Sequence, residues 1–298
     1  MIETFTVEQG GMRSLVSGGF VSSGEYVAWE PVTHGAQINA TNTGVPVGIS
    51  LAIYTGPSTI TVDDTIIENK IINTDLRVMA KNLTVRRCRL NGLIAIDESD
   101  ADGLYGFLIE DSRIHAGDRE VTAVGSKDYT ARRCHITGGN RTVYAYHNAR
   151  VEECHIHGQW VSEVVRTHAS GLRISQSSTI LRNSITCTAQ DVPGIGSGPS
   201  ANITGYGDFE AVSTVDITDN YFGPTTGGYG CYGGSSASKP YPDANNVRFT
   251  GNRWERGPSG VNAIYSPITD FDLLAVGNVW SNNAYSDGTF IDSDGGEL

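Results

Sequence analysis

The sequence predicts an all-β chain that folds as a single-stranded, right-handed parallel β-helix, with a non-repeating N-terminal segment as its cap or docking element. Three observations predict it. A short phrase recurs eight times, apolar residues alternate within each phrase, and no segment has the length and periodicity of a helix. The composition agrees, because 36 Gly and 39% hydrophobic residues among 298 suit many turns better than long helices.

The recurring phrase reads apolar, any residue, apolar, two polar residues, a small polar residue or Cys, any residue, apolar. Alternating apolar residues are the pattern of a strand with one buried face. The break in the alternation indicates a bend, after which one more side chain points inward. Bends recur after 20 to 37 residues, which is one coil plus loops of variable length. The bend residues are Cys88, Ser112, Cys134, Cys154, Asn183, Asn220, Asn252 and Asn278.

The residues at the bends predict stacking inside the solenoid. Ser replaces Cys in one coil, which is typical of small buried residues rather than of metal ligands or paired half-cystines. Five cysteines in a chain of this length also do not suggest a disulfide framework. The later bends all carry Asn, and we expect their amides to hydrogen-bond along the solenoid axis.

The two residues before each bend alternate in charge from coil to coil. In a parallel stack, equivalent positions lie above one another, so this alternation sets opposite charges side by side and avoids repulsion. We therefore interpret the arginine pairs as part of a ladder and not as a clamp for a polyanion. The series runs Arg86–Arg87, Glu110–Asp111, Arg132–Arg133 and Glu152–Glu153, with Arg182 next.

The bulk properties exclude several classes of function. A formal net charge of −12 argues against nucleic acid as a partner. No stretch approaches the roughly 18 apolar residues of a membrane span. Met1 to Thr33 lacks the basic start and apolar core of a secretory signal, so we expect synthesis and assembly in a cytoplasm.

The chain divides into two parts. Residues 1–34 fit no repeat, and residues 35–298 form the predicted β-helix domain. A solenoid needs its open end covered, so the first part is either a cap or a segment that attaches the chain to a larger assembly. Both interpretations stay open.

Several motifs carry a family resemblance. From Asn42 the chain has an NTGVP element, a YTGP element and a first full coil with the pattern Val78-x-Ala80-Lys81-Asn82-Leu83-Thr84-Val85-Arg86. Further on it has the segment THASGL at 167–172 and the run GGYGCYGGSSASKPYP at 227–242. Over about residues 35–285 these motifs resemble actinobacterial β-helix proteins related to the pectate-lyase-like superfamily, including tail proteins of actinobacterial phages.

This resemblance and the missing signal imply a virion-associated tail protein of the adhesin or receptor-binding type. The expected partners are a host cell-surface polysaccharide and, through the N-terminal segment, other tail proteins, with a homotrimer as the oligomer. A secreted protein is the alternative for location. Two functional alternatives remain: a polysaccharide lyase or glycoside hydrolase acting on cell-wall or capsular glycan, and a purely structural virion component. Fold likeness does not separate them.

The resemblance leans against an enzyme. Ser170 stands where the relatives carry an aspartate, so the most obvious catalytic carboxylate is missing. If the protein is an enzyme, Asp208 and Glu210 are the candidate carboxylates and His168 the candidate base.

Candidate glycan-binding residues come from the THASGL segment and from two long inserts at 188–214 and 223–246. Long loops on a rigid scaffold usually carry function, tyrosine offers flat amphipathic contact surface, and arginine binds carboxylate or phosphate substituents. The candidates are Arg166, His168, Arg173, Tyr206, Tyr229, Tyr232 and Tyr241.

We predict no metal or cofactor. A stripe of four histidines (115, 135, 155 and 157) offers only part of a zinc ligand set, and we favour surface stacking, with His135 and His155 outward and adjacent. An acidic loop with Asp97, Asp100 and Asp102 has the composition for Ca²⁺ but lacks the spacing of an EF-hand, so a solvated loop is the preferred interpretation.

Overall fold

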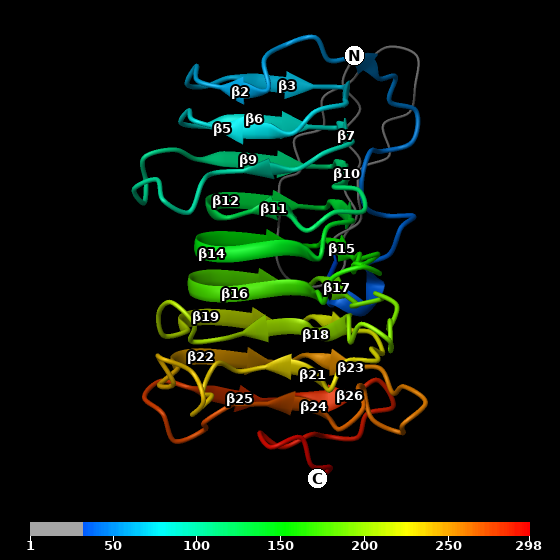
Figure 1. The fold of residues 1–298 in the computed structure, drawn as a ribbon, viewed down its shortest axis with the longest axis vertical. Helices are drawn as coiled ribbons and strands as arrows, with labels where there is room; N and C mark the ends of the chain where they lie inside the picture. Colours follow the sequence, from blue (N-terminus) through cyan, green and yellow to red (C-terminus); the bar gives the residue numbers. More distant parts are fainter. Residues whose placement is uncertain (1–31) are drawn as a thin grey trace, which may run out of the picture.

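The computed structural model describes residues 32–298 of the chain. These residues form strands, turns and one short 3-10 helix, η1 (Gly35–Gln37), with no α-helix among them. Strands pair in parallel from one coil to the next, and the coils stack along one long axis toward the C-terminus (Figure 1). The predicted all-β parallel solenoid is therefore confirmed. No helix within 32–298 is long and apolar enough to cross a membrane.

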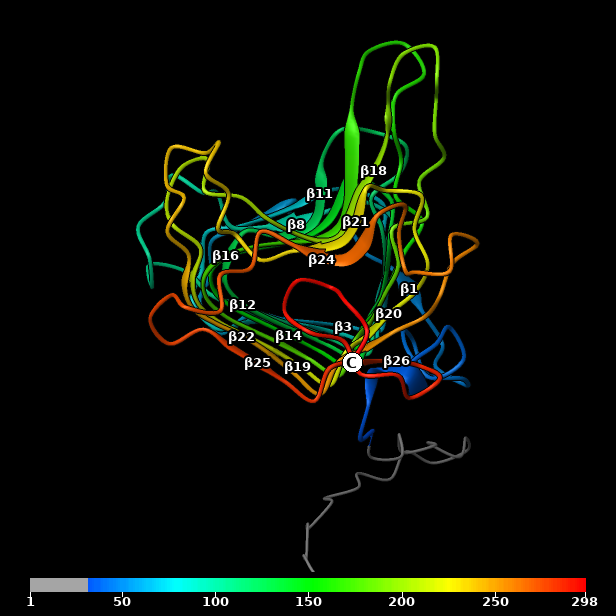
Figure 2. The same cartoon turned by 90° about the horizontal axis from the view of Figure 1, so that it is seen from below.

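Each complete coil contributes a strand to each of three walls around a packed interior (Figure 2). The first wall contains β2 (Thr59–Ile60), β5 (Leu76–Val78), β8 (Ile94–Ala95), β11 (Thr122–Gly125), β18 (Gly198–Gly205), β21 (Tyr229–Tyr232) and β24 (Ser266–Thr269). The second wall contains β3 (Ile66–Glu68), β6 (Leu83–Arg86), β9 (Phe107–Glu110), β12 (Lys127–Arg132), β19 (Ser213–Thr218), β22 (Asn245–Thr250) and β25 (Val279–Ser281).

Two long strands, β14 (Arg141–Glu152) and β16 (His168–Leu181), run through the corner between these walls, so the two walls form one 16-stranded sheet. The third wall is a separate 10-stranded sheet. It contains β1 (Ala52–Ile53), β4 (Lys70–Ile72), β7 (Arg89–Leu90), β10 (Arg113–His115), β13 (His135–Thr137), β15 (His155–Ile156), β17 (Ser184–Ile185), β20 (Tyr221–Phe222), β23 (Arg253–Trp254) and β26 (Ala284–Tyr285).

The core is a set of aligned apolar rows inside the coils. Alternate residues of most strands are buried, as the period-2 pattern predicts; Leu83, Val85 and Leu90 are fully buried examples from one coil. Toward the C-terminus the rows become aromatic, and Phe222, Phe249 and Trp254 are fully buried. Burial of such rows is the main favourable term for folding.

The corner between the second and third walls is built the same way in successive coils. The residue just before the bend residue adopts a left-handed backbone conformation, with φ of 68° at Gly251 and between 48° and 54° in the coils where this residue is not glycine. This conformation, which residues other than glycine adopt uncommonly, turns the chain at the corner. The residues other than Gly251 are Arg87, Asp111, Arg133, Glu153, Arg182, Asp219 and Asn282.

The bend residues themselves are buried and accept hydrogen bonds from the coil before. Ser112 Oγ accepts from the backbone N–H of Cys88 at 2.9 Å, and Asn183 Oδ1 accepts from that of Cys154 at 2.9 Å. The Asn220 amide bonds that of Asn183 at 2.9 Å, so the predicted asparagine ladder is confirmed. All five cysteines are free and buried, and burial of Cys88, Cys134 and Cys154 at the bends confirms the prediction for these three.

The last bend was predicted wrongly. Asn278 was expected there, but its Oδ1 accepts from the backbone N–H of Val247 at 2.8 Å, ahead of the second wall. The bend residue of this coil is Asn283, whose Oδ1 accepts from the Asn252 amide at 3.1 Å. Residues 270–278 are a loop, and Leu273 is half exposed within it.

The predicted charge ladder is confirmed. Arg132 pairs with Glu110 at 2.5 Å, Arg133 with Asp111 at 2.6 Å, and Arg182 with Glu153 at 2.9 Å. The carboxylates of Glu110 and Asp111 are largely buried, so these pairs belong to the wall and are not free to bind a ligand.

Residues 32–51 form a strap on the outside of the solenoid (blue in Figure 1). His34 contacts the Gly251 carbonyl at 3.1 Å, and the Gly35 N–H donates to Asp219 O at 2.7 Å. Further along, the Gly44 N–H donates to Arg133 O at 2.9 Å, before β1 starts the first coil. The strap thus runs along the coils in the direction opposite to their order. The predicted cap or attachment segment, residues 1–34, lies almost wholly outside the described residues.

Candidate functional site

The corner between the first and second walls carries a connected group of polar and aromatic side chains. Most coils have a loop here, at 96–106, 206–212 and 233–244, whereas β14 and β16 pass the corner without one. Side chains of the loops meet outward side chains of the two long strands. We call this group the corner cluster; it comprises Asp102, Tyr144, His147, Arg173, Ser175, Tyr206, Asp208, Phe209, Glu210 and Lys239.

Asp208 is held between two cations. Its carboxylate accepts from Arg173 at 2.8 Å and from Lys239 Nζ at 2.8 Å. Burial alone would raise the pKa of Asp208, but the hydrogen bond to Lys239 and the charge of Arg173 hold that pKa below its usual value. Asp208 therefore stays ionised at neutral pH and is not suited to act as a general acid.

The same two cations lie over an aromatic ring. Lys239 Nζ lies 4.8 Å and the Arg173 guanidinium 5.7 Å from the centre of the Tyr206 ring. Arg173 also lies 5.8 Å from the ring of Phe209, whose side chain is 69% exposed. An exposed aromatic face beside a charged fork is a surface on which a sugar ring can stack while its anionic substituent pairs with the arginine.

Glu210 forms a second arrangement with His147. Nε2 of His147 lies 2.7 Å from Glu210, and its Nδ1 lies 2.9 Å from Asp102. Ionised carboxylates only accept hydrogen bonds, so both contacts are bonds only if the imidazole carries two protons or one carboxyl is protonated. Ser175 Oγ donates to the same oxygen of Glu210 at 2.5 Å. His147 thus lies between two carboxylates, and imidazole and carboxylate are the groups that commonly act in general acid–base catalysis.

Asp102 is fixed by the buried Lys127. The ammonium of Lys127 donates to Asp102 at 3.0 Å, to the Glu98 carbonyl at 3.1 Å, and to the Asp100 carbonyl. The carboxylate of Asp97 accepts from the Ser99 N–H and hydroxyl. In the acidic loop considered for Ca²⁺, oxygens of Asp100 and Asp102 are thus bonded to an ammonium group.

A tyrosine row extends from the corner cluster across the first wall; it comprises Tyr206, Tyr232, Tyr229 and Tyr265. Successive ring centres are 5.0, 5.6 and 5.5 Å apart. Tyr265 is 70% exposed, which makes the end of the row accessible. Tyr241 is half exposed, and its N–H donates to Gly207 O at 3.0 Å, which docks the 233–244 loop onto the 206–212 loop.

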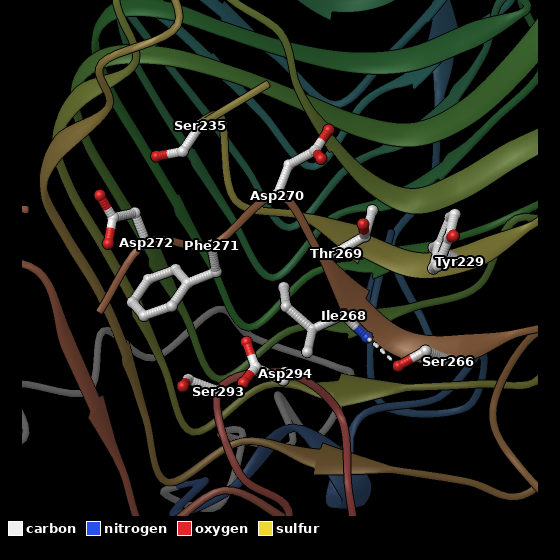
Figure 3. A pocket seen from close by; sticks show the side chains of 10 residues that line it. All are labelled: Tyr229, Ser235, Ser266, Ile268, Thr269, Asp270, Phe271, Asp272, Ser293 and Asp294. Atoms are coloured by element: carbon white, nitrogen blue, oxygen red, sulfur yellow. Dashed lines mark hydrogen bonds between the residues drawn. The ribbon is translucent and has the colours of Figure 1, made fainter. Parts of the chain in front are cut away.

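A hollow of about 350 Å³ adjoins this row through Tyr229. Figure 3 shows its lining of hydroxyl, carboxylate and aromatic side chains, including Ser235, Asp270, Asp272 and Asp294. Hydroxyl donors and carboxylate acceptors of this kind match the hydroxyl groups of a carbohydrate.

The structure brings together part of the predicted site. Arg173, Tyr206, Asp208 and Glu210 lie in the corner cluster, and Tyr229 and Tyr232 lie in the adjacent row. Sequence reasoning missed Tyr144, His147, Phe209 and Tyr265. The alternation Tyr144-x-Tyr146 on a strand was a signal for outward aromatic side chains, but nothing local marks His147 as a partner of Glu210.

Two predicted residues lie elsewhere. His168 is the first residue of β16, five positions before Arg173, which is about 16 Å along a strand. Arg166 lies in the loop before β16, at 157–167. This loop and the loop before β18, at 186–197, extend from the solenoid (Figure 2). His147, and not His168, therefore contacts Glu210. Ser170 is buried, and Gly171 packs against Ile185 and Asn202, so this segment serves packing.

Comparisons with known proteins add no assignment, because no protein-family model, no curated protein and no solved structure matches the chain.

Proposed function

We propose that this protein is a virion-associated tail protein of the adhesin type, which binds a host cell-surface glycan through the corner cluster and the tyrosine row. We further propose right-handed coils, in keeping with the general handedness of crossovers between parallel strands. Assembly in the host cytoplasm, a homotrimer, and attachment to other tail proteins through the N-terminal segment complete the proposal. These last points depend on the family resemblance of the motifs.

One observation carries the binding proposal: the exposed ring of Phe209 lies next to Arg173, which is itself fixed by Asp208 and lies over Tyr206. The arginine is prearranged, so little side-chain freedom is lost when a ligand binds. Aromatic rings give sugars a stacking face, and the guanidinium gives an acidic substituent a partner. This pairing favours an anionic glycan over a neutral one.

The binding test uses purified actinobacterial cell-wall polysaccharide and isothermal titration calorimetry. Arg173→Ala should cost about 1.5–3 kcal/mol of binding, because a hydrogen bond to a charged group is lost, which is roughly a 10- to 150-fold rise in Kd. Phe209→Ala should cost at least about 1 kcal/mol. Arg248→Ala and Phe290→Ala are matched controls, since both residues are exposed and outside the corner cluster. Equal losses in variants and controls would contradict the proposed site.

A depolymerase, either lyase or hydrolase, is the second candidate, and the Asp102–His147–Glu210 arrangement favours it. His147 takes the role first considered for His168. Turnover is followed by reducing ends and by the absorbance of unsaturated uronates. If the protein is an enzyme, His147→Gln should abolish product formation and leave binding nearly intact, whereas His168→Gln should change neither. Binding without product supports the adhesin, and a chain that neither binds nor cleaves is a structural component.

A further inference from the structure

Three histidines come together on the third wall, away from the corner cluster. His135 in β13 and His155 in β15 are register partners, and they follow Arg89 and Arg113 at the same position of earlier coils. The predicted outward and adjacent placement of His135 and His155 is thus confirmed. His157, two residues after His155, joins them, so that the three rings come from two successive coils.

The rings are close enough to share one ligand. Ring centres are 5.2 Å apart for His135 and His155, 5.0 Å for His135 and His157, and 4.3 Å for His155 and His157. One nitrogen from each ring lies within 4.8 Å of the other two. Zn–N bonds of about 2.0–2.1 Å in a tetrahedral site separate the nitrogens by about 3.3 Å, so modest side-chain rotations are enough.

One nitrogen of this group has no hydrogen-bond partner. Nε2 of His135 and Nε2 of His157 are 2.8 Å apart, a hydrogen bond in which one of the two nitrogens carries the proton and the other accepts it. Nδ1 of His155 is buried and has no hydrogen-bond partner. Buried polar atoms normally have partners, so this nitrogen points to a group that would bind it.

The three imidazole rings are partly buried on the third wall. Burial, followed by the charge of His157, lowers the pKa of His135 and of His155 to about 4, and burial lowers the pKa of His157 as well. The positive charge of Arg113, which also lowers the pKa of His135, repels a dication and reduces its affinity for the site.

We infer that His135, His155 and His157 form a binding site for a first-row transition-metal dication, Zn²⁺ above all, with three imidazole ligands and a fourth position open. Imidazole suits zinc, copper and nickel, whereas calcium and magnesium prefer oxygen. Three protein ligands with an open position are the arrangement of zinc sites that bind water or a further ligand, not of closed structural sites. The inference does not depend on the proposed glycan function.

The site also lies beside the strap. A Cβ added to Gly44 would be 3.3 Å from the Cβ of His135, so the strap packs against this ligand. A bound metal would join the coil of β13 to the coil of β15 at the point where the strap crosses them. The expected consequence is greater stability of the whole chain in the presence of metal, since a ligand that binds only the folded state stabilises it.

The test uses the full chain without a polyhistidine tag, freed of metal by a chelator and then titrated with Co²⁺. We expect one equivalent to bind with the visible absorption bands of four-coordinate Co²⁺, and we expect Zn²⁺ to displace it. His155→Gln and His157→Gln should each weaken binding at least about 100-fold, because changes even to outer partners of metal ligands cost about 10- to 100-fold.

His168→Gln is the matched control, since it removes an exposed histidine outside the three-histidine group. It should leave Co²⁺ binding unchanged. Circular dichroism of the metal-free variants verifies that each is folded, and only folded variants are compared. Absence of saturable binding, or equal binding by wild type and both His→Gln variants, would refute the site and leave the rings as a stacked surface.

Discussion

Asn220 shows how a single amide connects three coils. Its Oδ1 accepts from the backbone N–H of Asn183 at 2.8 Å and from the Asn183 amide, and its Nδ2 donates to the Ile180 carbonyl at 2.8 Å and to Asn252. The side chain is fully buried, so no water replaces these bonds. Small polar side chains at the bends therefore fix the register of the stack by hydrogen bonding as well as by size.

Replacing Asn220 with alanine should lower the free energy of unfolding by at least about 3 kcal/mol, because several buried groups lose their partners at about 1–3 kcal/mol each. Guanidinium unfolding followed by circular dichroism measures the effect. Asn91→Ala is the control, since the Asn91 amide makes an exposed hydrogen bond to Asn73, and it should change stability by no more than about 0.5 kcal/mol. A similar loss of unfolding free energy in both variants would show that the buried asparagine ladder contributes no more to stability than an exposed hydrogen bond does.

The positions of the bend residues were predictable where the phrase repeats, but not where a loop has the same pattern by chance. The bends from Cys88 to Asn252 follow from small residues at one position between apolar ones. Asn278 was misassigned because Asn278-x-Trp280 has the same pattern as Asn252-x-Trp254. Only the register of strand pairing shows which asparagine is the bend residue. β25 pairs with β22 so that Trp280 lies opposite Phe249 and not opposite Trp254.

At the scale of elements, the second wall ends in a ladder of alternating charge. Glu110 contacts Arg132 at 2.5 Å and Arg133 at 3.2 Å, and its register partner in the preceding coil is Arg86. Its side chain is only 14% exposed, which reduces screening by solvent. The ladder thus contributes more than isolated surface pairs do.

A charge reversal tests the ladder. Glu110→Lys should cost about 3–5 kcal/mol, since it leaves partly buried arginines beside a like charge, and Glu110→Gln should cost less. Asp216→Asn breaks the exposed pair with Arg248 and should cost at most about 1 kcal/mol. Unfolding midpoints at low and high salt provide the measurement. Indistinguishable midpoints for the two Glu110 variants would contradict the electrostatic account.

The elements that form the corner cluster were only half predictable. The two long inserts and their tyrosines stood out in composition, and Asp208 and Glu210 lie in one of them. The partner of Glu210, however, is 63 positions earlier in the chain, and Asp102 is 45 positions before that partner. Their meeting depends on which coils lack a corner loop, and that information lies in the register and not in any local motif.

At the scale of the whole molecule, the strap links coils that do not contact one another. Between His34 and Gly44 it touches residues as far apart in sequence as Gly251 and Arg133. Gly35 is the tightest point, because a Cβ there would lie 2.0 Å from the carbonyl oxygen of Asn183. A side chain at this position requires the strap to move away from the wall.

Gly35→Ala should therefore detach this part of the strap and destabilise the chain by about 1–3 kcal/mol, the usual cost of overpacking. A protease of broad specificity should then cleave within 35–51 well before it cleaves the coils. Gly194→Ala is the control, since a Cβ at Gly194 meets no atom within 4 Å. Unchanged cleavage of Gly35→Ala would mean that the strap adapts without leaving the wall.

The direction of the strap also imposes an order of events during synthesis. Residues 32–44 leave the ribosome before any coil, yet their partners Arg133, Asp219 and Gly251 are made much later. The first coils must therefore be stabilised by contacts with their neighbouring coils before the strap can bind to the wall. The part of the described chain that is synthesised first is thus among the last to reach its folded position. Its complete docking requires that the coils up to Gly251 have already formed.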